Sequence, residues 1–256
     1  LFHLINNATE NGIKGVKMLS SKEAMSIEPN IKCKCALWVP SSGVMDSHKI
    51  MQRLEYNFIS NNGKIVYNSV VKDVQYNTDN YNIVTDQGDQ IEAKVVINSA
   101  GLWSHKISKM LDIQTPEVYY CKGEYYKTNR YKNFNCLIYP PPSDISLGIH
   151  SVIQLNGDVS FGPNAYYIND IDYSIDDSNK EYFLEHINRY LNIKSEDIRP
   201  DFCGIRPKLQ NNNGNFEDFY INNEKGLKNF INMIGIDSPG LTSSLAIAEY
   251  VESIIL

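Results

Sequence analysis

The sequence predicts an α/β fold that also contains a separate antiparallel sheet. Two stretches, Val95–Ser104 and Phe230–Glu249, each combine a short apolar strand, a glycine-containing turn and the start of a helix. Two such units indicate one parallel sheet with a ligand lying across its carboxyl edge. Between 64 and 99, and again between 119 and 162, apolar and polar residues alternate with a period of two, which is typical of strands that bury one face.

Length and composition exclude several classes of protein. A chain of 256 residues can hold one large domain or two interwoven ones. The net charge is −6, and the absence of a basic stripe with interleaved aromatic residues argues against a nucleic-acid groove. No apolar run approaches the roughly 20 residues of a membrane helix. Cys33 and Cys35 form a lone C-x-C pair among five cysteines, so no metal site or disulfide framework is predicted, and a reducing, cytoplasmic compartment is expected.

The first half of the chain alternates helices with short strands. Residues 1–19 read as a helix end and a loop. Ser20 and Glu23 form a capping box that opens a short helix. Asp46 or Ser47 caps a longer helix, whose predicted inner face carries Ile50, Met51, Leu54 and Phe58. Strands are predicted at 36–39, 64–68, 70–74, 81–85, from 91 onward and at 95–98.

The second half opens with the aromatic-rich strand 119–126. Residues 147–155 and 158–161 are predicted to pair as a hairpin, because Asn156-Gly157 is a strong two-residue turn signal. Alternation places Gly148 and His150 on the face opposite the apolar residues Leu147, Ile149, Ile153 and Leu155. A second capping box at Ser178–Glu181 precedes a helix that buries Phe183, Leu184, Ile187 and Leu191, and a strand follows near 219–221. The last predicted helix presents Leu241, Leu245, Ala248, Val251 and Ile255 on one face.

Several side chains have both a chemical and a structural interpretation. His150 can act as a general base, because an unperturbed imidazole has a pKa of about 6.5; the alternative is a partly exposed histidine of a sheet. Arg206 can grip a carboxylate through two parallel hydrogen bonds, or form a surface ion pair. Lys122, Glu124, Tyr125 and Tyr126 line a polar pocket or belong to a half-buried strand. Ser238 lacks the glycine two residues earlier that a nucleophile elbow requires.

Several motifs, spread over nearly the whole chain, add a family resemblance. They are 40–46 (PSSGVMD), 96–102 (VINSAGL), 122–126 (KGEYY), 137–140 (LIYP), 147–150 (LGIH), 161–164 (FGPN), 204–208 (GIRPK) and 235–249 (GIDSPGLTSSLAIAE). On these motifs the chain resembles the FAD-dependent D-amino-acid-oxidase-like superfamily. Within it, the chain is similar to the L-2-hydroxyglutarate dehydrogenase/oxidase branch.

The resemblance implies a truncated Rossmann-like FAD domain, residues 43–115 and 201–256, interwoven with an antiparallel-sheet substrate domain, residues 1–42 and 116–200. Arg206 would bind the substrate carboxylate, and His150 would take the hydroxyl proton while hydride moves to the flavin. Lys122 and Tyr125 would contact the substrate. The electron acceptor would be oxygen or a quinone, and peripheral association with a membrane is left open. The implied FAD contacts are Val71, Ala100, Gly101, Leu102, Gly235, Ser238, Pro239, Gly240, Leu241 and Thr242.

One departure from the family pattern is large. The family opens with a strand, a G-x-G-x-x-G turn and a helix that hold the pyrophosphate. Here Gly12 and Gly15 are spaced only G-x-x-G, so that segment is expected to be absent, or to be supplied by a separate N-terminal chain. Three functions therefore stay open: oxidation of a small 2-hydroxy acid such as L-2-hydroxyglutarate, oxidation of glycerol 3-phosphate or an amino acid, and a non-catalytic fragment that has lost FAD binding.

Overall fold

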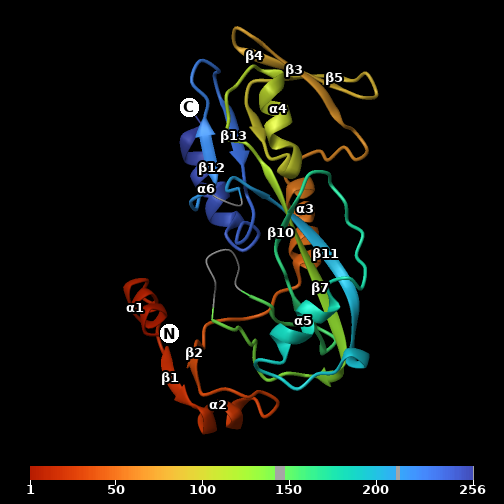
Figure 1. The fold of residues 1–256 in the computed structure, drawn as a ribbon. Coiled ribbons are helices and arrows are strands. Elements are labelled where there is room, and N and C mark those ends of the chain that lie inside the picture. The colour runs from red at the N-terminus through yellow and green to blue at the C-terminus, as the bar shows by residue number, and fades with distance from the viewer. Residues whose placement is uncertain (142–147, 212–213, 256) are drawn as a thin grey trace. The chain divides into compact units, whose positions relative to one another are not determined.

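The computed structural model describes residues 1–141, 148–211 and 214–255, which fold into two compact units (Figure 1). Unit 1 contains residues 1–61, 123–165 and 173–204, and unit 2 contains residues 62–122, 166–172 and 205–256. Residues 43–61, which we assigned to the flavin domain, thus fall in unit 1, whereas 116–122 and 166–172 fall in unit 2. Which domain binds the flavin and which the substrate stays a prediction.

Unit 1 combines short helices with antiparallel strands. The chain passes between the units within β7 (Tyr119–Lys132) and β11 (Ile198–Lys208). The other elements of unit 1 are α1 (Phe2–Glu10), β1 (Lys17–Ser20), α2 (Ser21–Ile27), β2 (Cys35–Trp38), α3 (Ser47–Ser60), β8 (His150–Ile153), β9 (Asp158–Gly162), α5 (Lys180–Ile187) and the 3-10 turn η2 (Ser195–Asp197).

The predicted capping box at the start of α2 is confirmed. The Ser20 hydroxyl accepts a hydrogen bond from the Glu23 backbone N–H, and the Glu23 carboxylate accepts one from the Ser20 N–H at 2.7 Å. The second predicted box, at Ser178–Glu181, is wrong: Asn179 precedes α5 and its side chain does not cap the helix. Phe183, Leu184 and Ile187 are buried on α5 as expected, and they pack in one core with Tyr126, Val159, Phe161 and Leu191.

The hairpin of β8 and β9 forms, but its turn is longer than predicted. His150 pairs with Gly162 and Ile153 with Val159, while the Gly157 N–H donates to the Gln154 carbonyl at 2.9 Å. Four residues therefore make the turn, and Leu155, predicted on the apolar face, lies in it and is 67% exposed. Leu147, predicted at the start of this hairpin, lies outside the described residues.

Unit 2 holds two three-stranded sheets. In one, β12 (Tyr220–Asn223) pairs antiparallel with β13 (Phe230–Ile234) (Figure 1). Strand β13 in turn pairs parallel with β6 (Val96–Asn98), so the predicted parallel pairing is confirmed. The other is the meander of β3 (Val71–Asn77), β4 (Asn80–Thr85) and β5 (Gln90–Ala93). The 3-10 turn η1 (Gly101–Trp103) and helix α4 (Ser104–Met110) follow β6, β10 (Tyr166–Ile168) pairs with the first residues of β7, and α6 (Ser244–Ile254) follows β13.

Two predictions are wrong, the strand at 64–68 and the inner face of α3, and the apolar face of α6 is largely exposed. Residues 64–68 form no strand, and Val66 and Tyr67 are more than 60% exposed. Helix α3 buries none of its side chains. On α6 only Val251 is buried, while Leu245 is 66% exposed. In each case the apolar pattern is present, but most of its side chains are exposed or only half-buried.

Candidate functional site

Two loops of unit 2 lie at the same edge of one sheet. The parallel register pairs Phe230 with Val96 and Asn232 with Asn98, so β13 and β6 end at the same edge of the sheet. The segment Ala100–Leu102 follows β6, and the segment Gly235–Thr242, here called the 235–242 loop, follows β13. The carboxyl edge of a parallel sheet is where α/β folds bind ligands. The structure therefore brings together nine of the ten predicted cofactor contacts.

The tenth predicted contact, Val71, belongs to the other sheet of unit 2. It begins β3, is half-buried, and pairs with Thr85 immediately before a β-bulge. Its neighbour Val70 accepts a hydrogen bond from the Asp86 backbone N–H at 2.8 Å. The meander thus fixes the backbone at Val71 independently of the two loops.

Glycine is required at the start of the 235–242 loop. Gly235 has φ +74°, and a Cβ atom there would overlap the side chain of Leu209. The loop is tightened by the Gly240 N–H, which donates to the Asp237 carbonyl at 2.6 Å, and by the Thr242 hydroxyl, which donates to the Pro239 carbonyl at 2.9 Å. These hydrogen bonds and the close approach of Gly235 to Leu209 therefore hold the conformation of the loop.

An ion pair joins this loop to β11. Lys208 Nζ lies 3.0 Å from Asp237 Oδ2, and the two side chains are only 18% and 12% exposed. Both residues lie within the family motifs 204–208 and 235–249, but neither was predicted to be a site residue. Their opposite charges were visible, but 29 residues separate them and only the fold brings them together.

A buried polar network underlies both loops. Asn98 Nδ2 donates to Asn232 Oδ1 at 2.7 Å and to the Ser104 carbonyl at 2.8 Å. The Ser108 hydroxyl donates to the same Asn232 oxygen at 2.9 Å, and Asn232 Nδ2 donates to Glu224 Oε1 at 2.7 Å. The network therefore ties β6, β13 and α4 together through side chains that are almost completely buried.

The Arg206 guanidinium is half-buried and contacts the Cys121 thiol, with Nη2 3.6 Å from Sγ. Within the described part of the chain no carboxylate lies within 4.0 Å of it. Lys122, predicted to bind substrate, differs in this respect: its buried ammonium lies 3.5 Å from Asp172. Burial raises the pKa of the Cys121 thiol, and Arg206 opposes that rise.

Tyr125, the other predicted substrate contact, lies in unit 1 on β7. Its ring stacks on Phe202, with centroids 4.3 Å apart and planes inclined by 14°. The preceding Glu124 carboxylate is buried and accepts hydrogen bonds from Asn164 at 3.0 Å and Asn179 at 2.6 Å. Glu124 and Tyr125 of the KGEYY motif therefore have packing roles in unit 1.

His150 is buried, so it is not the partly exposed sheet histidine that was the alternative to a general base. Its side chain lies against Tyr139, with ring centroids 4.3 Å apart and planes inclined by 16°. Nδ1 is 3.0 Å from the Gly148 carbonyl. Burial lowers the pKa of the His150 imidazole, because the charged ring is disfavoured away from water, and the bond to Gly148 partly offsets this lowering. The ring is thus favoured in its neutral form, as a general base requires.

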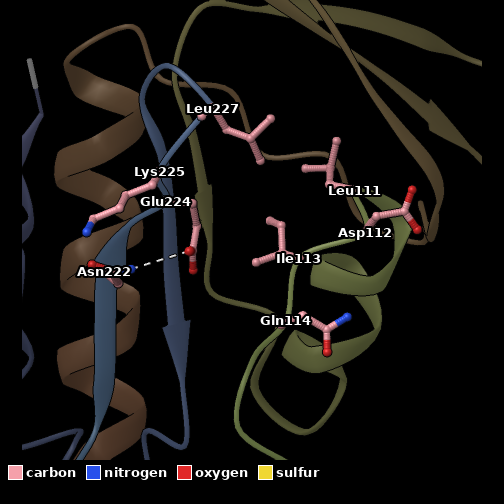
Figure 2. Close-up of a pocket in the computed structure, with 9 residues that line it drawn as sticks. Leu111, Asp112, Ile113, Gln114, Asn222, Glu224, Lys225 and Leu227 are labelled. Atoms are coloured by element: carbon pink, nitrogen blue, oxygen red, sulfur yellow. Dashed lines mark hydrogen bonds between the residues drawn. The ribbon is translucent and has the colours of Figure 1, made fainter.

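A shallow pocket of about 470 Å³ also lies in unit 2 (Figure 2). None of the predicted site residues lines it. Its buried carboxylate, Glu224, accepts hydrogen bonds from Tyr220 at 3.0 Å, Asn222 at 3.3 Å and Asn232 at 2.7 Å. Because neutral donors already satisfy both oxygens of Glu224, this carboxylate serves the buried network and is not left open to a ligand in the pocket.

Comparison with known proteins now decides the family. The model of the family described as "FAD dependent oxidoreductase" matches residues 2–254. The chain belongs to this family. It is 32% identical, over 97% of its length, to mitochondrial L-2-hydroxyglutarate dehydrogenase of Arabidopsis thaliana, and 27% identical, over 98%, to glycerol 3-phosphate dehydrogenase of Caloramator mitchellensis. It spans 62% and 52% of those proteins, respectively.

Solved structures confirm the fold. FAD-bound L-alpha-glycerophosphate oxidase from Mycoplasma pneumoniae superposes with a TM-score of 0.82 at 20% identity, covering 93% of this chain and 63% of that one. Glycine oxidase from Geobacillus kaustophilus gives 0.76 at 19%, covering 95% and 65%. The predicted family, its FAD-dependent oxidoreductase class and the mixed α/β fold are therefore confirmed.

The residues present fit part of a flavin site. Gly101 has φ +55°, and the position of a Cβ atom there is open, with no atom within 4 Å, so its backbone is accessible from the edge of the sheet. The 235–242 loop is preformed beside it. The phosphate-binding fingerprint that the family carries has no counterpart in this sequence.

Proposed function

We propose that the chain forms the larger part of an FAD-dependent enzyme that oxidises a small 2-hydroxy acid, with L-2-hydroxyglutarate oxidised to 2-oxoglutarate as the best candidate. The observation that carries the proposal is the Arg206 guanidinium, half-buried and without a carboxylate partner among the described residues. A guanidinium left without an internal anion suits the carboxylate of a substrate. The similarity to the Arabidopsis protein supports the choice of substrate.

The residues divide the reaction between them. Arg206 binds the carboxylate next to the hydroxyl-bearing carbon, and His150 accepts the hydroxyl proton at Nε2. The C–H electron pair leaves as hydride, and FAD, when bound, supplies its acceptor. The backbone segments Ala100–Leu102 and Gly235–Thr242, together with Val71, hold the cofactor. Lys122 and Tyr125 stay predicted substrate contacts, although Asp172 already neutralises Lys122.

A second part of the proposal concerns the incomplete sheet. Within the described chain β6 pairs only with β13, and Ile97 on β6 is 45% exposed. Parallel strands normally have neighbours and are covered on both faces. We propose that β6 receives a further parallel strand from a segment that carries the Gly-rich phosphate-binding turn. A separate N-terminal chain is one source of that segment.

An alternative substrate has specific support. The Caloramator and Mycoplasma proteins are named for glycerol phosphate, and a guanidinium also suits a phosphate. A non-catalytic fragment without FAD remains the alternative from another class, motivated by the absent fingerprint. The five cysteines are free thiols. A cytoplasmic location stays a prediction. No described helix is long and apolar enough to cross a bilayer.

The test is the visible absorption spectrum of the purified chain with added FAD. A bound flavin that L-2-hydroxyglutarate bleaches supports the proposal. Bleaching by glycerol 3-phosphate or an amino acid alone would overturn the hydroxy-acid assignment. Failure to bind FAD, both alone and with a supplied strand–Gly-turn–helix segment, would favour the non-catalytic alternative. Once reduction is seen, reoxidation by oxygen or a quinone identifies the acceptor.

A further inference from the structure

Two sequence motifs of unit 1, Leu137–Pro140 and Gly148–His150, contain residues other than His150 that had no role in the reaction described above. The structure brings them together around one imidazole. Ser151 N–H donates to the Ile138 carbonyl at 2.9 Å, and the Ile138 N–H donates to the Ser151 hydroxyl at 2.8 Å. These bonds fasten the segment before Tyr139 to β8, one residue beyond His150.

The Gly148 carbonyl determines which ring nitrogen carries the proton. A carbonyl oxygen can only accept, so the neutral His150 ring donates from Nδ1, 3.0 Å away, and its lone pair lies on Nε2. Among the described residues Nε2 has no hydrogen-bond partner. It is therefore the atom left for a substrate hydroxyl.

Glycine at position 148 is needed for this carbonyl to point at the ring. Its φ is +73°, and a Cβ atom there would lie 2.8 Å from Pro140 Cγ. A side chain would force either Pro140 or the backbone to move. Pro140 and Gly148 thus fit against each other, and the carbonyl orientation depends on that fit.

Tyr139 limits the remaining freedom of the ring. Its stacked geometry, 4.3 Å and 16°, restricts rotation of the imidazole plane while the Nδ1 bond restricts its tilt. Tyr139 is 50% exposed, so its ring is only partly used in packing the core. Burial raises the pKa of the Tyr139 hydroxyl, so this side chain stays neutral near pH 7.

We propose that Tyr139, Pro140 and Gly148 are positioning residues that hold His150 as the Nδ1–H tautomer, with Nε2 available as a base. The proposal rests on the proposed function for the meaning of that base. The tautomer itself can be measured without cofactor or turnover, which separates the two.

The experiment is histidine-selective 15N NMR on the whole chain, with the His150 signal assigned by its loss in His150→Gln. The Nδ1–H form should dominate in the wild type by about fivefold or more, the factor that one net hydrogen bond contributes. Tyr139→Ala should raise the pKa of His150 and reduce the dominance of this tautomer, and Gly148→Ala should reduce it further. His186, whose Nδ1 lies 2.8 Å from the Tyr182 carbonyl in the same unit, serves as an internal reference.

Tyr173→Ala is the matched control, because Tyr173 is 54% exposed and its ring stacks on no histidine among the described residues. An Nε2–H tautomer in the wild type would overturn the proposal without any variant. So would a His150 signal that Tyr139→Ala and Tyr173→Ala leave equally unchanged. If the tautomer is as expected but His150→Gln reduces flavin at the wild-type rate, the base role fails while the positioning contacts stand.

Discussion

Replacing Lys208 by Met should loosen the 235–242 loop. The ion pair with Asp237 is 3.0 Å long and its side chains are 18% and 12% exposed. Removing one partner of a fully buried pair costs about 3–5 kcal/mol, because a charge stays buried without its counterion. The remaining exposure lets water screen part of this, so we expect a cost of about 2 kcal/mol.

The loss of stability should appear locally, because the Asp237 backbone makes two of the hydrogen bonds that hold the loop. Its carbonyl accepts the Gly240 N–H, and its own N–H donates to the Gly235 carbonyl at 2.9 Å. Amide hydrogen exchange of these residues should accelerate by about thirtyfold, the factor that corresponds to 2 kcal/mol. The dissociation constant for FAD, measured by flavin fluorescence, should rise in the same direction.

Lys228→Met is the control. Lys228 and Asp79 form an ion pair of almost equal length, 3.1 Å, in the same unit, but 61% and 70% exposed. Exposed pairs contribute about 0–1 kcal/mol, so exchange in the loop should not change. The double variant Lys208→Met/Asp237→Asn should recover part of the loss. Equal exchange in the Lys208 and Lys228 variants would refute the role of the buried pair.

Three further predictions concern the two units. Arg206→Met should raise the KM for a 2-hydroxy acid by about a hundredfold, because loss of a charged hydrogen-bonding partner costs about 1.5–3 kcal/mol. Arg199→Met, at an exposed position of the same strand, should leave the KM unchanged. Equal KM values for the two variants would remove Arg206 from substrate binding. Folding lowers the pKa of His150, so the neutral ring contributes to stability above the unfolded pKa of about 6.5. This contribution is lost as the pH falls from there through the folded pKa. Denaturant titrations at several pH values should show the loss, and His150→Gln should abolish it. Leu191→Ala, at a fully buried position, should cost about 2–5 kcal/mol, whereas Leu155→Ala, 67% exposed, should cost less than about 0.5 kcal/mol; similar melting temperatures would contradict the core assignment.

Local signals were sufficient for much of the fold. The Ser20 capping box, the parallel partners Val95–Asn98 and Phe230–Ile234, and the β8–β9 hairpin all follow from spacing and turn chemistry. The family motifs also placed nine candidate cofactor residues at one sheet edge. The choice of Arg206 and His150 came from residue chemistry joined to family resemblance, and their roles stay predictions.

Contacts between distant segments could not be predicted in the same way. Lys208 and Asp237 attract each other only after β11 and β13 are in place, and no spacing rule links them. The exposure of Leu245 and Tyr67 was equally hidden, because an apolar stripe predicts that a face will be covered but not what covers it. The prediction for Leu155 was wrong for a local reason. Asn156-Gly157 suits a two-residue turn, but the hairpin uses a four-residue turn, which takes Leu155 out of the strand.

The buried amides of Asn98 and Asn232 have a consequence for strand register. If β6 slipped by one residue against β13, the Asn98 side chain would move to the opposite face of the sheet, and Asn232 would lose its partner. Each polar group then left unpaired would cost about 1–3 kcal/mol. Apolar neighbours such as Ile97 and Ile231 would tolerate such a slip far better. The hydrogen bond between the two amides thus selects one register of β6 against β13. This register fixes where the two following loops leave the sheet relative to each other.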